Sequence, residues 1–190
     1  MTAALTGELW LIRHGETDWS ASGRHTSITD LDLNATGNAA AKGLASRLAD
    51  VAFAQILTSP RLRARRTAEI AGFAHAEVDA DLAEWNYGEY EGVTTTHIRE
   101  SVPGWTIWTH RCPGGESADE VGARLDRVVA RARAVEGNTA AFAHGHSLRV
   151  LAARWLGLPV ADGRLFDLDT GTISMLGYER ETPVVLHWNS

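Results

Sequence analysis

The chain has 190 residues, of which 44% are hydrophobic and 22% are charged, a composition ordinary for one globular domain with a sizeable core. Its formal net charge of −6 argues against general binding to nucleic acid or to a membrane surface, so an anionic ligand requires a local basic pocket. Cys112 is the only cysteine, which excludes an intrachain disulfide and fits the cytoplasm. Residues 1–7 lack the pattern of a signal peptide, and no apolar run approaches the ~20 residues needed to span a bilayer.

Strand-like and helix-like segments alternate along the chain, and this alternation predicts an α/β layered domain. We expect strands over residues 9–12, 53–57, 139–143, 173–176 and 184–188. We expect helices over residues 34–48, 59–71, 117–132 and 147–156. Ser59 and Pro60 are the predicted N-cap and first residue of the second helix. Ser117 and Glu120 predict a capping box at the start of the third helix.

Two of the expected strands end in the same dipeptide, His14-Gly15 and His144-Gly145. Ligands of parallel α/β sheets bind beyond the carboxyl ends of the strands, so two histidines and Arg13 would converge if these strands are neighbours. Arginine presents a planar fork that matches phosphate oxygens, and neutral imidazole can accept a phosphoryl group near pH 7. Gly15 would let the backbone approach a ligand. Taken alone, the motif fits a surface turn as well as a site of phosphoryl transfer.

The segment LIRHGETDWS, which ends at Ser20, resembles the signature of the histidine phosphatase superfamily, the phosphoglycerate-mutase-like proteins. The resemblance continues in the family's order through GRHT (23–26), LDLN (31–34), SPRLRA (59–64), EWNYG (84–88), EG (91–92), GGES (114–117) and HG (144–145). The family usually has asparagine where this chain has Ser20. The fold that we expect is an α/β three-layer sandwich in a single domain, residues 1–190, with a mostly parallel central sheet, flanking helices and a short cap segment over the site at about residues 92–116.

The resemblance implies a role for each matching residue of the catalytic centre. His14 would attack phosphorus and form a phosphohistidine, while Arg13 and Arg63 would hold the phosphate oxygens. His144 would be the second histidine of the phosphate pocket. Glu84 would protonate the leaving oxygen and then deprotonate the attacking water, because an alkoxide is a poor leaving group. These cationic and donor groups can replace the metal ions of other phosphoryl-transfer enzymes, so we expect no cofactor and no metal.

Further contacts with the substrate are expected around this centre, from Gly15, Ser20, His25, Thr26, Tyr87, Gly145 and His146. A metal site at His144 and His146 is the alternative interpretation, but a third ligand with recognisable spacing is missing. Arg63 lies in the first turn of its helix, where an anion is favoured, whereas Arg65 and Arg66 fit a solvated helix face.

The length of the cap segment decides between the two activities of the family. Cofactor-dependent mutases that resemble this chain carry a long insertion here, which closes the site and keeps water from the phosphohistidine. The short cap of this chain favours the branch of small acid phosphatases and sugar-bisphosphate phosphatases. The alternatives are a phosphoglycerate mutase and, from another class, a catalytically weak phosphate-binding regulatory module. Against the latter, all five catalytic positions keep the family residue.

We therefore expect a cytoplasmic hydrolase of small phosphate esters, with no nucleic-acid or membrane partner, as a monomer or homodimer. Loops set specificity, so one sequence does not identify the substrate; small phosphorylated sugars and glycolytic acids are the first candidates. The sequence raises two further hypotheses about the cap segment. Arg99, His110 or Arg111 would receive a second anionic group, and three tryptophans, Trp85, Trp105 and Trp108, would lie over the leaving group or in the core.

Overall fold

The computed structural model describes residues 7–190, and within them six strands form one mixed sheet in the order β3-β2-β4-β1-β5-β6. The strands are β1 (Leu9–Arg13), β2 (Phe53–Thr58), β3 (Glu77–Val78), β4 (Asn138–Ala143), β5 (Ile173–Glu179) and β6 (Thr182–His187). Strands β3, β2, β4 and β1 pair in parallel, whereas β5 and β6 extend the sheet in antiparallel pairs. The expected mostly parallel sheet is confirmed, and the short strand β3 is an addition to the prediction.

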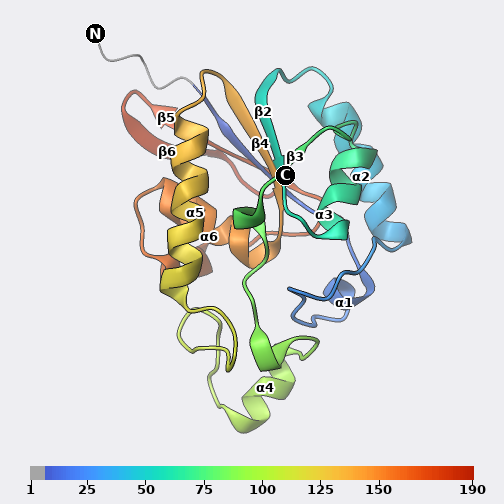
Figure 1. Ribbon diagram of the computed structural model, residues 1–190, viewed down its shortest axis with the longest axis vertical. Helices are drawn as coiled ribbons and strands as arrows, with labels where there is room; N and C mark the ends of the chain where they lie inside the picture. Colours follow the sequence, from blue (N-terminus) through green and yellow to red (C-terminus); the bar gives the residue numbers. More distant parts are fainter. Residues whose placement is uncertain (1–6) are drawn as a thin grey trace.

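The helices cover both faces of the sheet, so the expected three-layer arrangement is confirmed. Helices α2 and α3 lie on one face, α5 and α6 lie on the other, and α4 lies in the cap segment beyond one end of the sheet (Figure 1). The α-helices are α1 (Asp18–Ala21), α2 (Ala35–Leu48), α3 (Leu62–Ile70), α4 (Thr95–Ser101), α5 (Ala118–Arg133) and α6 (Gly145–Trp155). Three short 3-10 helices are η1 (Ala80–Leu82), η2 (Gly88–Tyr90) and η3 (Val160–Leu165).

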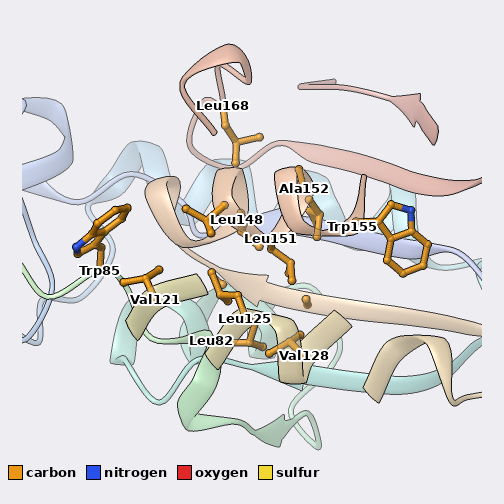
Figure 2. Packing of buried hydrophobic residues seen from close by; sticks show 14 of the residues in the cluster. Leu82, Trp85, Val121, Leu125, Val128, Leu148, Leu151, Ala152, Trp155 and Leu168 are labelled. Carbon is orange, nitrogen blue, oxygen red and sulfur yellow. The ribbon is translucent and has the colours of Figure 1, made fainter. Parts of the chain in front are cut away.

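The core consists of two hydrophobic clusters, one on each face of the sheet. Figure 2 shows Val121 and Leu125 of α5 packed beside Leu148 and Leu151 of α6. The other cluster includes side chains of the sheet, α2 and α3, among them Ile12, Phe142, Leu44, Leu48 and Ala68. Because neighbouring residues of a strand point to opposite faces, a strand buried on both faces needs an unbroken apolar run. This requirement explains the sequence of β1.

Two helix starts differ from the prediction. Helix α3 begins at Leu62, its N-cap is Arg61, and no side chain caps it, so the predicted N-cap at Ser59 and first turn at Pro60 are wrong. The Ser59 backbone N–H instead continues the sheet pattern by donating to the Phe142 carbonyl at 2.9 Å. Helix α6 begins at Gly145, two residues before the predicted start. The capping box of Ser117 and Glu120 is confirmed.

Within residues 7–190, no helix is long and apolar enough to cross a membrane. The N-terminal stretch for which the sequence predicts no signal peptide lies outside the described residues, apart from Gly7.

Candidate active site

The register of the sheet brings the two His-Gly motifs together. Strands β1 and β4 are neighbours, with Arg13 opposite Ala143, and the His14 backbone N–H donates to the Ala143 carbonyl at 3.0 Å. The rings of His14 and His144 consequently lie with their centroids 5.1 Å apart. The sequence prediction that these two strands are neighbours and that their histidines converge is confirmed.

His14 is held in one tautomer by its own loop. Its Nδ1 lies 2.7 Å from the carbonyl oxygen of Gly15, and since a carbonyl only accepts, Nδ1 carries the proton and Nε2 carries a lone pair. The side chain is only 4% exposed, and burial, followed by the charges of Arg63 and Arg13, lowers its pKa well below the ordinary value. The result is a neutral imidazole whose Nε2 is available as a nucleophile.

Two arginines act on His14. Arg63 is fully buried in the first turn of α3, and its Nε–H donates to His14 Nε2 at 3.3 Å. Its Nη1 and Nη2 donate to the carbonyls of Thr29 at 3.1 Å and Thr26 at 2.9 Å, which fixes the plane of the guanidinium. Arg13 donates from Nη1 to the Leu168 carbonyl. The Arg13 Nε is buried and has no partner within residues 7–190, so it remains available to a ligand.

His144 completes the group around the expected phosphate position. It is fully buried, its Nε2 lies 2.7 Å from the Ser59 hydroxyl, and its Nδ1 has no partner in the described part of the chain. Burial and then the charge of Arg63 lower its pKa well below the ordinary value. A buried nitrogen without a partner is costly, and a phosphate oxygen would satisfy it.

Glu84 is anchored by three backbone N–H groups. Its Oε1 accepts from Trp85 at 2.9 Å and from Ser147 at 2.8 Å, and its Oε2 accepts from His146 at 3.1 Å. Two of these donors belong to the first turn of α6, where helix N–H groups lack partners within the helix. One lone pair of Oε2 remains for a proton, so the carboxyl group can serve a leaving oxygen while its position stays fixed.

A pocket of about 270 Å³ opens above His14. The expected catalytic residues Arg13, His14 and Glu84 line it, and so do six of the expected contacts: Ser20, His25, Thr26, Tyr87, Gly145 and His146. Arg63 and His144 are not in its lining and approach His14 from the protein interior. Gly15 also lies outside the lining, and a Cβ there would lie 2.4 Å from the Gly37 oxygen. Its lack of a side chain serves the packing of this loop against α2.

Sequence reasoning missed several residues of the pocket wall: Thr17, Gly23, Arg24, Arg149, Asp167, Leu168 and Asp169. A signal existed for Arg149, which follows Gly145 by four residues and therefore lies on the same face of α6. The acidic residues Asp167 and Asp169 belong to a loop before β5 that carried no recognisable motif.

The basic residues predicted for a second anion do not reach this pocket. Arg99, His110 and Arg111 lie outside its lining, and the Arg99 Nε donates instead to the Trp105 carbonyl at 2.8 Å. The arginines that line the pocket besides Arg13 are Arg24 and Arg149, which corrects the hypothesis about the cap segment.

None of the three tryptophans lines the pocket, and they differ in burial. Trp85 and Trp105 are 2% and 1% exposed and belong to the core. Trp108 is half-buried, and its ring centroid lies 5.2 Å from that of His146.

The alternative metal site at His144 and His146 is not supported by the positions of these side chains. His146 directs Nδ1 to the Tyr87 hydroxyl at 2.6 Å, and His144 directs Nε2 to Ser59. Among residues 7–190, no group of three or more His, Cys, Asp or Glu side chains is placed to hold a metal ion.

Comparison with known proteins agrees with this arrangement. Residues 9–190 match the model of the histidine phosphatase superfamily (branch 1). The chain is 43% identical to an acid phosphatase of Mycobacterium tuberculosis, over 90% of this chain and 86% of the relative. It is 36% identical to sedoheptulose 1,7-bisphosphatase of Saccharomyces cerevisiae, over 83% and 70% of the two chains. A solved structure of the open reading frame Rv3214 of Mycobacterium tuberculosis superposes with a TM-score of 0.93 at 40% identity, covering 96% of this chain and 97% of that one.

Proposed function

Because the chain belongs to the histidine phosphatase superfamily and is a phosphatase of that family, we propose that it hydrolyses phosphomonoesters of small metabolites through a phosphohistidine on His14, without a metal ion. The observation that carries the proposal is the state of His14, a neutral imidazole with its Nδ1 proton held by the Gly15 carbonyl. This leaves the Nε2 lone pair beside the guanidinium of Arg63.

In the first half of the reaction, the lone pair of His14 Nε2 attacks phosphorus and the bond from phosphorus to the leaving oxygen breaks. Glu84 donates its proton from Oε2 to that oxygen, so that a neutral alcohol departs. Arg13, Arg63 and the Nδ1–H of His144 stabilise the negative charge on the transferring group, and their fixed positions remove the cost of reorganising water.

In the second half, a water molecule attacks the phosphohistidine and Glu84 accepts a proton from it. The bond between phosphorus and Nε2 breaks, inorganic phosphate departs and His14 returns to its neutral form. Hydrolysis rather than transfer back to the substrate fits the cap segment 92–116, whose one α-helix is the short α4. Residues at the pocket rim such as Arg24 are exposed, so water has access to the intermediate.

The substrate class follows from the relatives and from the size of the pocket. The compared proteins include an acid phosphatase and a sugar bisphosphatase, which supports small phosphorylated metabolites as substrates. A pocket of about 270 Å³ is too small for a folded phosphoprotein surface and suits a metabolite of a few carbons.

The test is hydrolysis of p-nitrophenyl phosphate and a panel of sugar phosphates in excess EDTA, by the wild type and by His14→Ala. We expect turnover to survive EDTA and to fall by about 10⁴-fold or more in the variant, because the covalent route is lost. Turnover lost with EDTA, or kept by the variant, would contradict the proposal. Isomerisation of 3-phosphoglycerate without phosphate release would identify the protein as a mutase. No activity in either assay would favour a phosphate-binding module.

A further inference from the structure

Arg149 lies in the wall of the pocket and has no role in the steps above. It projects from α6 near His146 and lines the pocket. Its Nε donates to the Gly163 carbonyl at 3.1 Å and its Nη2 donates to the Arg164 carbonyl at 3.2 Å. Both acceptor carbonyls belong to η3, so η3 holds one edge of the guanidinium in place.

The face of the same guanidinium is held by Trp108. The central carbon of the Arg149 guanidinium lies 4.8 Å from the Trp108 ring centroid, a stacking geometry that suits arginine. Gly163 makes this contact possible, because a Cβ there would lie 2.6 Å from the Trp108 ring. Within residues 7–190, no carboxylate lies within ion-pair distance of Arg149 and its Nη1 has no hydrogen-bond partner. The side chain is therefore immobilised with one nitrogen left for a ligand.

Asp167, on the loop before β5, lines the same pocket as Arg149. Its Oδ1 accepts from the Leu168 backbone N–H at 3.1 Å, and its Oδ2 has no partner in the described chain. The pocket thus offers a fixed donor on α6 and a carboxylate acceptor on the loop before β5. Hydroxyl groups both donate and accept, so neighbouring hydroxyls of one ligand match this pair.

The balance of charge limits what the leaving group can carry. The histidines of the pocket are neutral, because burial lowers the pKa of His14 and His146 well below the ordinary value. When Glu84 holds its catalytic proton, four arginines (Arg13, Arg24, Arg63 and Arg149) face two carboxylates (Asp167 and Asp169). Arg13 and Arg63 supply the two positive charges that match one phosphomonoester dianion, whereas Arg24 and Arg149 are balanced by Asp167 and Asp169. A second phosphate at the mouth would therefore be left uncompensated beside Asp167.

We propose that Arg149 and Asp167 form a subsite for the hydroxyl groups of a polyhydroxylated leaving group without a second phosphate, so that sugar and polyol monophosphates are preferred. This inference rests on the proposed phosphatase function. The proposal makes Arg149 a residue that determines substrate specificity. Replacement of Arg149 should therefore lower kcat/KM only for substrates that carry these hydroxyls.

The experiment compares Arg149→Met and Asp167→Ala on ribose 5-phosphate, fructose 1,6-bisphosphate and p-nitrophenyl phosphate. We expect each variant to lower kcat/KM for ribose 5-phosphate by about 10-fold, the value of one lost hydrogen bond to a charged group. Turnover of p-nitrophenyl phosphate, which has no hydroxyls, stays within about 2-fold of the wild type because the phosphate end is intact. Asp167→Ala raises kcat/KM for the bisphosphate, because a repulsive charge is removed.

The matched control is Arg154→Met, on the same helix but paired with Asp126 outside the pocket, and it should leave the substrate ranking unchanged. An equal loss on all three substrates in Arg149→Met would overturn the subsite. If the wild type prefers the bisphosphate and Arg149→Met loses this preference, Arg149 binds a second anionic group and the proposed hydroxyl subsite is wrong. Absence of wild-type turnover of p-nitrophenyl phosphate would instead reject the proposed function, so the two failures are distinguishable.

A separate observation concerns Glu91, which belongs to a family-like motif but lies outside the pocket lining. Its Oε1 accepts from the backbone N–H groups of Ser27 and Thr29, each at 2.9 Å, and its Oε2 accepts from the Ser27 hydroxyl. One carboxylate thus holds the turn of residues 27–29. The carbonyls of Thr26, just before this turn, and of Thr29, at its end, accept from the nitrogens of Arg63, and the Ser27 carbonyl accepts at 3.5 Å.

From this chain of contacts we infer that Glu91 is a positioning residue that acts through Arg63. Each link is a hydrogen bond within the protein, and the last link sets the 3.3 Å approach of Arg63 Nε to His14 Nε2. Loss of the carboxylate would release the turn and let the guanidinium leave the plane that faces the phosphate.

The test is a double-mutant cycle that combines Glu91→Gln with Arg63→Met. In the wild-type background, Glu91→Gln should lower kcat/KM for p-nitrophenyl phosphate by about 10-fold and weaken inhibition by inorganic phosphate to a similar extent. In the Arg63→Met background it should add less than about 2-fold, because the group it positions is gone. Equal effects in both backgrounds would show that Glu91 does not act through Arg63.

Two further variants protect this test against a general loss of structure. Ser27→Ala removes the hydroxyl bond to Glu91 and a longer bond from the Tyr87 backbone N–H at 3.4 Å, but it keeps the backbone bonds to the carboxylate. It should show a smaller effect with the same dependence on Arg63, so it carries the test if Glu91→Gln does not fold. Glu89→Gln changes an exposed carboxylate of the neighbouring η2 that lies outside the pocket, and it should leave both kcat/KM and phosphate inhibition unchanged.

Discussion

The two ends of the pocket are built differently. At the phosphate end, His14, Arg63 and His144 are at most 4% exposed, and all three are placed by the ends of neighbouring strands or by the helix that follows a strand. At the mouth, Arg24 and Asp167 are exposed and are supplied by loops. The phosphate end is therefore fixed by the sheet, whereas the mouth depends on local loop contacts.

Under the proposed function, this difference places the chemistry at one end of the pocket and substrate selection at the other. Fixed dipoles and charges stabilise a transition state only if they need not reorganise, which requires the rigid, dry end of the pocket. Contacts on loops can differ between relatives without disturbing the sheet. A change at the phosphate end should affect every substrate, and a change at the mouth should affect some.

Replacement of Glu84 is expected to have the largest effect among the changes that follow. In Glu84→Gln the proton donor is lost while the side chain keeps its size, so kcat for an alkyl phosphate should fall by about 10²–10⁴-fold. For p-nitrophenyl phosphate the fall should be much smaller, because nitrophenolate departs with little help. Steady-state kinetics on the two substrates measures the split, and equal losses on both would mean that Glu84 only positions other groups.

The second change, Arg63→Met, removes the buried guanidinium that faces His14. We expect kcat/KM to fall by about 10²–10³-fold on every substrate, as for the loss of one oriented donor to a developing charge. Arg65→Met is the matched control, because Arg65 is exposed on the same helix. Thermal unfolding of both variants separates a catalytic loss from a folding defect, and a loss restricted to some substrates would contradict the assignment of Arg63 to the phosphate end.

The same division explains what the sequence could predict. The apolar run of β1 and the alternation of elements predicted the sheet, and the shared endings of β1 and β4 predicted the meeting of His14 and His144. These features have strong local signals, namely hydrophobic runs, glycines and caps. Ser59 was misassigned as an N-cap, since its sequence signal is the same whether the hydroxyl caps a helix or binds a distant histidine.

The mouth was predicted less well because its contacts join segments far apart in the chain. Asp167 belongs to no recognisable motif. Arg24 stands in the family-like motif GRHT but received no role there, and the two residues line one pocket only through the fold. Arg99 and Arg111 were chosen for their place in the cap segment, yet their side chains lie outside the pocket. Proximity in sequence to a motif is a poor guide where loops, rather than strands, set the geometry.

The buried histidines predict how stability depends on pH. Burial is the main cause that lowers the pKa of His14 and His144 well below 6.5 and the pKa of His25 to about 4. Between those values and the ordinary pKa of ~6.5, the unfolded chain binds more protons than the folded one. The contribution of these histidines to the free energy of unfolding should therefore be complete above about pH 6.5. As the pH is lowered further, the free energy of unfolding should decrease by up to about 1.4 kcal/mol per pH unit for each such histidine.

Urea unfolding at pH 7.0 and 5.5 measures this loss, and the range stays above the pH at which carboxylates titrate. His144→Asn, at the phosphate end, should reduce the pH dependence, and so should His25→Gln at the mouth. The control is His187→Gln on β6, which should leave the dependence unchanged because His187 is exposed and has no ion-pair partner among residues 7–190. Equal stability of the wild type at both pH values would contradict the assignment of neutral, buried imidazoles.

The smallest effect is expected at Ser20, which lines the mouth where the family usually has asparagine. Its hydroxyl accepts from the Thr17 backbone N–H at 2.9 Å and donates to the Thr17 carbonyl at 3.0 Å, so the protein itself uses its hydrogen bonds. Ser20→Ala should change KM by less than about 3-fold while it costs about 1 kcal/mol of stability, because the capping box loses the bond from the Thr17 N–H to the Ser20 hydroxyl. A larger rise in KM without loss of stability would show that the hydroxyl leaves Thr17 to bind substrate, and the mouth would then take a direct part in recognition at this position.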